Sequence, residues 1–173
     1  MTSEYNIVWI DDDKERREKK RGGVGTDNRI NLITLEPMEA ASELLGGTNG
    51  EGKIPPELDL ALVDWYLHTD EFSGDGPSIE GILRDTHKTT PVYAFSGEYG
   101  NAEFEREQKR GEHRFALITS PDRLDDEDLI QDIQDYQQIR TKEGEDIDGI
   151  LELLDAPADL TEKIRSTLPQ EFA

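Results

Sequence analysis

The sequence contains no cysteine, few basic residues and no long apolar segment. Without cysteine, the chain has no disulfide bond, no thiolate nucleophile and no zinc site with cysteine ligands. No apolar run approaches the length of about 18 residues that a membrane-spanning helix requires, and residues 1–5 do not have the character of a secretory signal. These absences favour a cytoplasmic protein that does not enter membranes.

The charge of the chain is strongly one-sided. Among 173 residues, 40 are acidic and 19 are basic, which gives a formal net charge of -21. A chain this negative repels phosphate backbones and anionic lipids, so we do not expect direct binding to nucleic acid or to a membrane. Acidity of this degree is typical of proteins adapted to high salt but also occurs elsewhere, and the sequence leaves the choice open. A carboxylate is therefore informative only where its neighbours are apolar.

Five short apolar runs, rich in β-branched and aromatic residues, predict buried strands at 7–10, 30–35, 58–63, 91–95 and 115–118. The segments between and after them predict helices at 14–21, at 39–45, after Pro77, at 101–110 and at 128–140. In the second of these helices, Met38, Ala41, Leu44 and Leu45 are predicted to form the apolar face. Five strand–helix repeats indicate an α/β fold with a doubly wound, five-stranded parallel sheet.

The composition changes after about residue 142. Two further short helices are predicted at 147–154 and 160–168, separated by Ala156 and Pro157. We therefore predict two parts, a domain at 1–142 and a C-terminal helical extension at 143–173. The extension is expected either to pack back on the domain or to dock onto a partner.

Polar residues follow four of the predicted strands at the point where each strand ends. These residues are Asp11–Asp13 after the first strand, Asp64 after the third, Ser96 after the fourth and Ser120 after the fifth. In an open parallel sheet, ligands bind beyond the carboxyl ends of the strands, so we expect these side chains to converge. Clustered carboxylates repel one another, and a hard cation such as Mg²⁺ relieves that repulsion. Asp64 interrupts an apolar stretch and therefore needs a partner or a cation, whereas Asp13 alone is well suited to capping the following helix.

Three segments together resemble the receiver domain of two-component response regulators. They are Ile-Val-Trp-Ile-Asp-Asp-Asp at 7–13, Leu-Ala-Leu-Val-Asp at 60–64 and Val-Tyr-Ala-Phe-Ser-Gly at 92–97. The resemblance covers roughly residues 5–140 and implies a (βα)5 receiver or flavodoxin-like fold. It also implies signalling through a protein partner, with phosphoryl groups supplied by a histidine kinase, a phosphotransfer protein or a small donor. A homodimer is compatible with it.

The resemblance also implies roles for individual residues. Asp64 is similar to the phosphoacceptor, and Asp11 and Asp12 are similar to the acidic pair of receivers. Asp12 would bind Mg²⁺ directly, Asp11 would act largely through water, and Tyr66 would offer its backbone carbonyl to the metal. Ser96 is similar to the residue whose hydroxyl contacts a phosphoryl oxygen. The resemblance therefore implies a phosphoacceptor signalling protein rather than an enzyme that turns over.

The sequence departs from receivers in three places. Receivers normally have a lysine before a proline at the end of the fifth strand, where this chain has Ser120 and Pro121. The aromatic switch position is Leu117, and the loop after Asp64 is longer than usual. We consider Arg123 as a replacement cation. These departures favour an alternative in which the receiver fold is a binding module that does not depend on phosphorylation.

A third interpretation is a phosphatase of the haloacid-dehalogenase type, which begins with a strand followed by Asp-x-Asp. Asp11 would be the nucleophile, Asp13 the general acid and base, Ser96 the hydroxyl of the second motif, and Asp125–Asp126 the late acidic pair. This interpretation gives Asp64 no role. The order of the strands discriminates between the receiver and the phosphatase, because the receiver requires the strand at 7–10 to lie beside the strand at 60–63.

The three histidines lack metal-binding spacing, and Gly22–Gly25 is interpreted as a turn.

Overall fold

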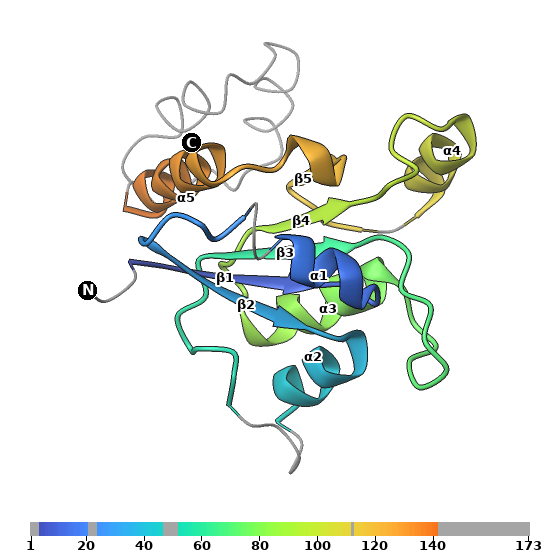
Figure 1. Cartoon of the computed structure of the whole chain (residues 1–173), viewed down its shortest axis with the longest axis horizontal. Coiled ribbons are helices and arrows are strands. Elements are labelled where there is room, and N and C mark those ends of the chain that lie inside the picture. Colours follow the sequence, from blue (N-terminus) through green and yellow to red (C-terminus); the bar gives the residue numbers. More distant parts are fainter. Residues whose placement is uncertain (1–3, 21–23, 47–51, 112, 142–173) are drawn as a thin grey trace, which may run out of the picture. The chain divides into compact units, whose positions relative to one another are not determined.

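The computed structural model describes residues 4–20, 24–46, 52–111 and 113–141 (Figure 1). These residues include a five-stranded parallel sheet with the order β2-β1-β3-β4-β5. Its strands are β1 (Tyr5–Ile10), β2 (Ile30–Leu35), β3 (Leu60–Asp64), β4 (Val92–Phe95) and β5 (Leu117–Thr119). The predicted doubly wound α/β fold is confirmed, and β1 lies beside β3 as the receiver interpretation requires.

The helices follow the strands in the predicted alternation. They are α1 (Lys14–Lys20), α2 (Pro37–Leu44), α3 (Gly76–Thr86), α4 (Ala102–Arg110) and α5 (Asp126–Thr141), with the short 3-10 helix η1 (Pro121–Arg123) before α5. The helices predicted at 147–154 and 160–168, and the predicted domain boundary after residue 142, lie outside the described residues.

Helices cover both faces of the sheet. Side chains of α2 and α3 form one apolar cluster with residues of β1 and β3, including Leu44, Leu83, Val8 and Val63. In the strand order, the connection from β1 to β2 runs towards one edge of the sheet. The connection from β2 to β3 runs back in the opposite direction, past β1. Right-handed crossovers of opposite direction place their helices on opposite faces, so α1 lies across the sheet from α2 (Figure 1).

The apolar face of α2 differs from the prediction. Its buried residues are Pro37, Ala40, Ala41 and Leu44, which recur every three or four residues. The observed buried face is rotated around the helix by about one residue relative to the predicted face. Met38 and Leu45 therefore lie beside the buried face, and their side chains are 45% and 69% exposed. The small Ala40, rather than the long Met38, contacts the core.

Two strands begin later than their apolar runs. β3 starts at Leu60, because the carboxylate of Asp59 accepts a hydrogen bond from the backbone N–H of Asn6 at 2.8 Å. β5 starts at Leu117, because Phe115 packs against the apolar clusters beside the sheet. Single backbone hydrogen bonds, from Asp59 to Asn6 and from Ala116 to Val92, still connect the start of each run to the neighbouring strand.

The chain divides into two compact units, Met1–Leu129 and Ile130–Ala173. The sheet, α1–α4 and the first turn of α5 belong to the first unit, and the rest of α5 to Thr141 belongs to the second. Among the described helices, none combines the length and the apolarity needed to cross a membrane.

Candidate functional site

Three carboxylates meet at the carboxyl ends of β1 and β3. Ile10 pairs with Val63 in the sheet, which brings Asp11 level with Asp64. One carboxylate oxygen from each of Asp11, Asp12 and Asp64 lies within 4.8 Å of the others. Asp11 is fully buried and Asp64 is 2% exposed. The sequence predicted this convergence from the strand ends alone.

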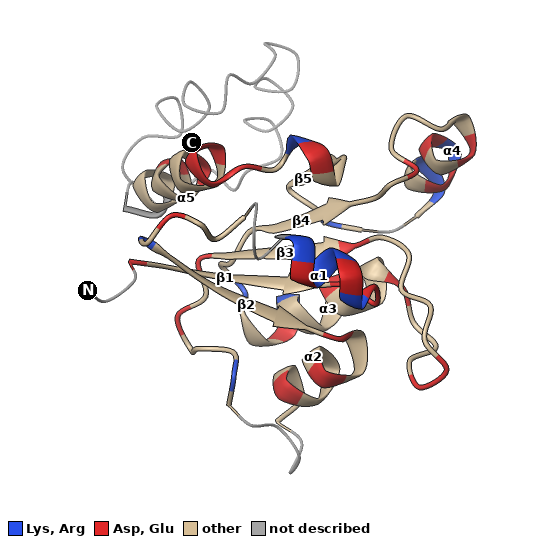
Figure 2. Cartoon of the chain, in the orientation of Figure 1, with Lys and Arg blue, Asp and Glu red and all other residues tan. Residues whose placement is uncertain are grey.

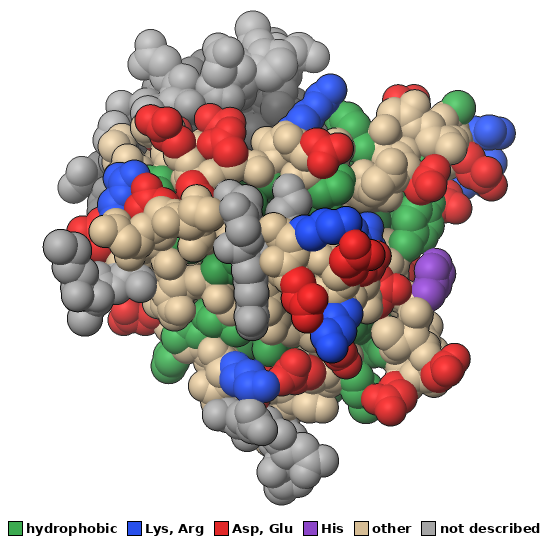
Figure 3. Space-filling model, in the orientation of Figure 1, with side chains coloured by type: hydrophobic (Ala, Val, Ile, Leu, Met, Phe, Trp, Pro, Cys, Tyr) green, Lys and Arg blue, Asp and Glu red, His purple; other side chains and the backbone are tan. Residues whose placement is uncertain are grey.

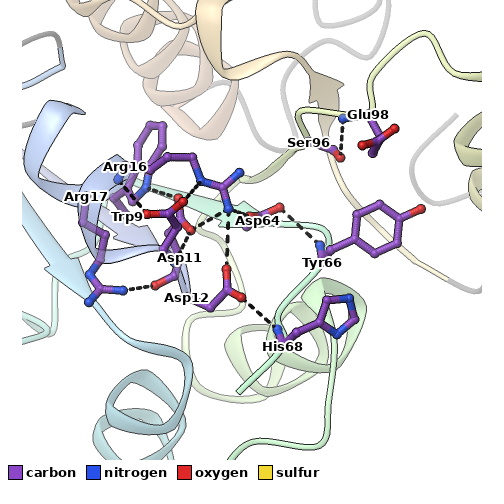
Figure 4. Close-up of polar contacts among 11 residues, drawn as sticks. Trp9, Asp11, Asp12, Arg16, Arg17, Asp64, Tyr66, His68, Ser96 and Glu98 are labelled. Atoms are coloured by element: carbon purple, nitrogen blue, oxygen red, sulfur yellow. Dashed lines mark hydrogen bonds and ion pairs between the residues drawn. The ribbon is translucent and has the colours of Figure 1, made fainter. Parts of the chain in front are cut away.

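Asp11 is fixed by hydrogen bonds from its own strand and turn. Its Oδ2 accepts a hydrogen bond from Nε1 of Trp9 at 3.3 Å, and its Oδ1 accepts one from the backbone N–H of Asp13 at 2.8 Å (Figure 4). Burial nevertheless raises the pKa of the Asp11 carboxyl group, and the neighbouring Asp12 adds to this. The charged form of Asp11 therefore needs a nearby cation.

Asp64 has the same need to a greater degree. Its Oδ1 accepts a hydrogen bond from the backbone N–H of Tyr66 at 3.2 Å. Burial, together with the charges of Asp11 and Asp12, raises the pKa of Asp64 to about 7, although Arg16 opposes the shift. A buried carboxylate with a strongly raised pKa, close to two others, is a candidate for a functional site.

The guanidinium of Arg16 lies among the three carboxylates (Figure 4). Its Nη2 atom is 2.5 Å from Oδ2 of Asp64, 3.0 Å from Oδ1 of Asp11 and 3.5 Å from Oδ1 of Asp12. Burial alone would lower the pKa of Arg16, but the surrounding carboxylates raise it, so the side chain stays charged. Arg16 was not among the residues predicted from the sequence, where Arg123 was considered as the cation. The guanidinium carbon of Arg123 lies 5.2 Å from the centre of the Tyr99 ring.

The orientation of α1 is set by its first residues. Asp13 caps the helix, because its Oδ1 accepts a hydrogen bond from the backbone N–H of Arg16 at 3.0 Å. This bond is the main cause of the lowered pKa of Asp13. Arg17 donates to the backbone carbonyl of Asp11 and pairs with Glu36 at 2.8 Å. The neighbours of Arg16 therefore anchor the helix while Arg16 itself reaches the cluster.

The loop after β3 is attached to the same cluster. Oδ2 of Asp12 accepts a hydrogen bond from the backbone N–H of His68 at 3.0 Å. The rings of Tyr66 and His68 are stacked with centroids 6.0 Å apart, and the Tyr66 hydroxyl donates to Glu107 at 2.6 Å. Burial, followed by the hydrogen bond to Glu107, raises the pKa of Tyr66 to about 12. The site is thereby linked to α4.

Ser96 lies at the end of β4, directly after Phe95, which pairs with Asp64 in the sheet. It is buried, and its Oγ accepts a hydrogen bond from the backbone N–H of Glu98 at 3.1 Å. Figure 4 shows Ser96 apart from the contacts around Arg16. Ser120 follows β5 and is partly buried.

The acidic pair that the phosphatase interpretation requires lies elsewhere. Asp126 accepts hydrogen bonds from the backbone N–H groups of Gly25 and Asp27 at 2.6 and 2.9 Å. Gly25 and Asp27 precede β2, so they lie at the amino ends of the parallel strands, opposite the carboxylate cluster. Asp11 and Asp126 therefore do not share a site, and the phosphatase interpretation loses its late acidic pair.

Positive charge is concentrated on α1. Five of its seven residues are basic, in a chain whose net charge is -21. Figure 2 shows acidic residues on each of the other helices as well. Figure 3 shows that basic side chains of α1 lie directly beside acidic ones on this face of the molecule. Of these basic residues, Arg16 contacts all three carboxylates of the cluster.

Comparison with known proteins shows the fold. No family model and no curated protein matches the chain. Among solved structures, the phosphorylated cyanobacterial phytochrome response regulator RcpA is 17% identical, with a TM-score of 0.51 over 81% of this chain and 94% of that chain. The receiver domain of AraT from Geobacillus stearothermophilus is 15% identical, with a TM-score of 0.52 over 81% and 98%. The chain has the fold of response-regulator receiver domains.

A longer protein shows the same likeness. NtrX from Brucella abortus is 21% identical, with a TM-score of 0.52 over 80% of this chain and 29% of that chain. This chain therefore matches one part of a larger protein there, and nearly the whole of the shorter structures.

Proposed function

We propose that this chain is a receiver-like signalling domain in which Asp64 accepts a phosphoryl group beside a bound Mg²⁺ ion. One observation carries the proposal. On a sheet with the order of receiver domains, the buried Asp64 lies with Asp11 and Asp12 in a cluster whose oxygens are within 4.8 Å of one another.

The residues present fit a divalent cation. The cluster offers only oxygen ligands, which Mg²⁺ prefers. Burial, followed by the charges of Asp11 and Asp12, raises the pKa of Asp64 to about 7 even with Arg16 beside it, so a further cation at the cluster would favour the ionised form. Asp11, Asp12, Asp64 and the backbone carbonyl of Tyr66 would hold the ion. When bound, the ion supplies charge neutralisation to phosphoryl oxygens.

The reaction is a phosphoryl transfer to a carboxylate. An oxygen of ionised Asp64 forms a bond to the phosphorus of the donor, and the bond from phosphorus to the donor's nitrogen or oxygen breaks with its electron pair leaving on the donor. The product is an acyl phosphate on Asp64. The Ser96 hydroxyl, which now accepts from Glu98, would then donate to a phosphoryl oxygen.

The proposed partners follow from this chemistry. A histidine kinase or phosphotransfer protein in the cytoplasm supplies the phosphoryl group, and a downstream protein, or a second copy of the chain, reads the phosphorylated state. The helical extension proposed for residues 143–173 is the segment that we expect to contact such a partner.

A second candidate is a binding module that does not depend on phosphorylation. Two observations favour it. Ser120 stands where receivers have a lysine, and the guanidinium of Arg16 already contacts the proposed phosphoacceptor at 2.5 Å. In this function the acidic cluster and Arg16 would hold one fixed conformation.

Beryllium fluoride, which mimics a phosphoryl group on aspartate, distinguishes the two. We expect Mg²⁺ with beryllium fluoride to raise the unfolding temperature of the wild type and of Asp85→Asn, an exposed position on α3, but not of Asp64→Asn. No response in the wild type would instead support the binding module.

A further inference from the structure

One nitrogen of Arg16 lies at the position where the three carboxylates converge. We propose that Arg16 is a resident counterion that competes with the divalent cation for Asp11, Asp12 and Asp64. Cation binding is then an exchange, in which the guanidinium leaves the cluster as the metal enters. This inference rests on the proposed function, because it requires that the cluster bind a divalent cation.

The distances support exclusion of one cation by the other. Nη2 of Arg16 is within 2.5–3.5 Å of one oxygen from each carboxylate. Those carboxylates offer oxygens that are all within 4.8 Å of one another, so a metal bound to them would lie in the same space. A guanidinium and a divalent ion also repel each other at such a separation. The cluster therefore holds one or the other.

Arg16 is able to leave without unfolding the helix that carries it. Its side chain is 33% exposed, whereas that of Arg17 is 10% exposed and is fixed to the Asp11 carbonyl and Glu36. The Nε atom of Arg16 is buried and has no hydrogen-bond partner, so its present position leaves one donor unsatisfied. Nε lies 3.7 Å from Oδ2 of Asp13, whose side chain is 46% exposed. Asp13 thus offers the displaced guanidinium a partner nearer to solvent.

The exchange would regulate the phosphoacceptor. While Arg16 occupies the cluster, its Nη2 donates a hydrogen bond to Oδ2 of Asp64. The other oxygen, Oδ1, accepts a hydrogen bond from the backbone N–H of Tyr66. Both nucleophilic oxygens are then engaged. Entry of the cation removes the guanidinium from Asp64, so the concentration of free divalent cation would decide whether the phosphoacceptor is accessible to a donor.

Metal affinity tests the exchange directly. Trp9, which donates to Asp11, provides a fluorescence signal for titration with MgCl₂ or MnCl₂ at fixed ionic strength. Arg16→Gln keeps much of the side-chain stem but removes the charge. We expect it to bind the cation roughly tenfold or more tightly than the wild type, as for loss of one strong competing ion pair. Arg16→Lys, which keeps a mobile charge, is expected to lie between the two.

Lys14→Ala is the matched control, because it removes the same charge from an exposed position on the same helix. If Arg16→Gln binds no more tightly than Lys14→Ala, competition is refuted while the proposed function stands. If the wild type and every folded variant fail to bind either metal, the proposed cation site itself is refuted, and the exchange with it. Circular dichroism of each variant identifies any that does not fold.

Discussion

Nη2 of Arg16 lies 2.5 Å from Oδ2 of Asp64, although the two residues are 48 positions apart in the sequence. The contact joins the first turns of α1 to the central strand of the sheet. Even so, the pKa of Asp64 is raised to about 7, because burial and two neighbouring carboxylates outweigh one guanidinium that is partly exposed. The cluster is therefore an arrangement of charge that costs stability at neutral pH in the absence of a further cation.

Removing the Asp64 charge should stabilise the metal-free protein at neutral pH. The folded pKa of about 7 exceeds the unfolded value of 3.8, so the folded state binds more protons between them. The contribution of Asp64 to the free energy of unfolding is therefore fully present below about pH 4. It is lost as the pH rises through 7, and between these values the free energy of unfolding falls by up to roughly 1.4 kcal/mol per pH unit. We expect Asp64→Asn to be more stable than the wild type at pH 8, with the difference shrinking towards pH 4. Urea unfolding across this range measures it.

Mg²⁺ provides the control for this prediction. A cation that binds through Asp64 stabilises the wild type more than Asp64→Asn, which lacks one charged ligand, so millimolar Mg²⁺ should narrow the stability difference at pH 8. If the stability difference between the wild type and Asp64→Asn does not change between pH 4 and pH 8, Asp64 is ionised over this whole range. Its burial would then be compensated without a metal.

Gly76 places the α3 helix directly against the backbone of Asp64. A Cβ atom at this position would come within 2.6 Å of the Asp64 carbonyl oxygen and 2.9 Å of the Trp65 Cα. Because both are backbone atoms, Gly76→Ala must displace the end of β3. We expect a loss of about 1–3 kcal/mol in the free energy of unfolding, together with a weaker response to beryllium fluoride.

Gly81 is the matched control on the same helix. A Cβ atom there meets nothing within 4 Å. Gly81→Ala should therefore stabilise the protein by about 0.5–1 kcal/mol, as alanine does in a helix interior, and leave the beryllium fluoride response unchanged. Equal effects of the two substitutions would contradict the close approach of α3 to Asp64.

A lysine at the end of β5 should strengthen the phosphoryl site. Ser120 follows Thr119, whose carbonyl accepts a hydrogen bond from the backbone N–H of Ser96. Ser120→Lys adds a charge close to the strand ends where Asp64 lies, so beryllium fluoride should bind several-fold more tightly. Thr89→Lys adds the same charge before β4, at the amino ends of the strands and away from Asp64. It should have little effect on the affinity for beryllium fluoride. The two titrations, followed by tryptophan fluorescence, are compared at equal ionic strength. Equal affinities would argue against a phosphoryl pocket near Ser120.

Much of the fold was predictable because its three inner strands, β1, β3 and β4, are almost wholly buried on both faces. Continuous apolar runs such as 60–63 have few other folded environments, and the polar residue that ends each run marks the edge where ligands bind. Asp11 and Asp64 were found in this way. Their convergence needs only parallel strands in the right order, and the alternation of strands and helices supplies that order.

The role of Arg16 was not predictable by the same reasoning. Residues 14–20 are charged throughout, so no apolar stripe indicates which face of α1 turns towards the sheet. That rotation is fixed by the Asp13 cap and the Arg17 bond to the Asp11 carbonyl, which are local, and by the tertiary contact between Arg17 and Glu36. The available signal was spacing, since Arg16 follows Asp12 by four residues, as in a helical ion pair. In an acidic chain with many such pairs, that signal is weak.

Phosphorylation of Asp64 is the most direct test of the account. The purified chain is incubated with acetyl phosphate, a small phosphoryl donor, with and without Mg²⁺, and its intact mass is measured. We expect the wild type to gain one phosphoryl group in a reaction that requires Mg²⁺, and we expect no gain in Asp64→Asn. An unmodified wild type, or a phosphoryl group that persists in Asp64→Asn, would contradict it.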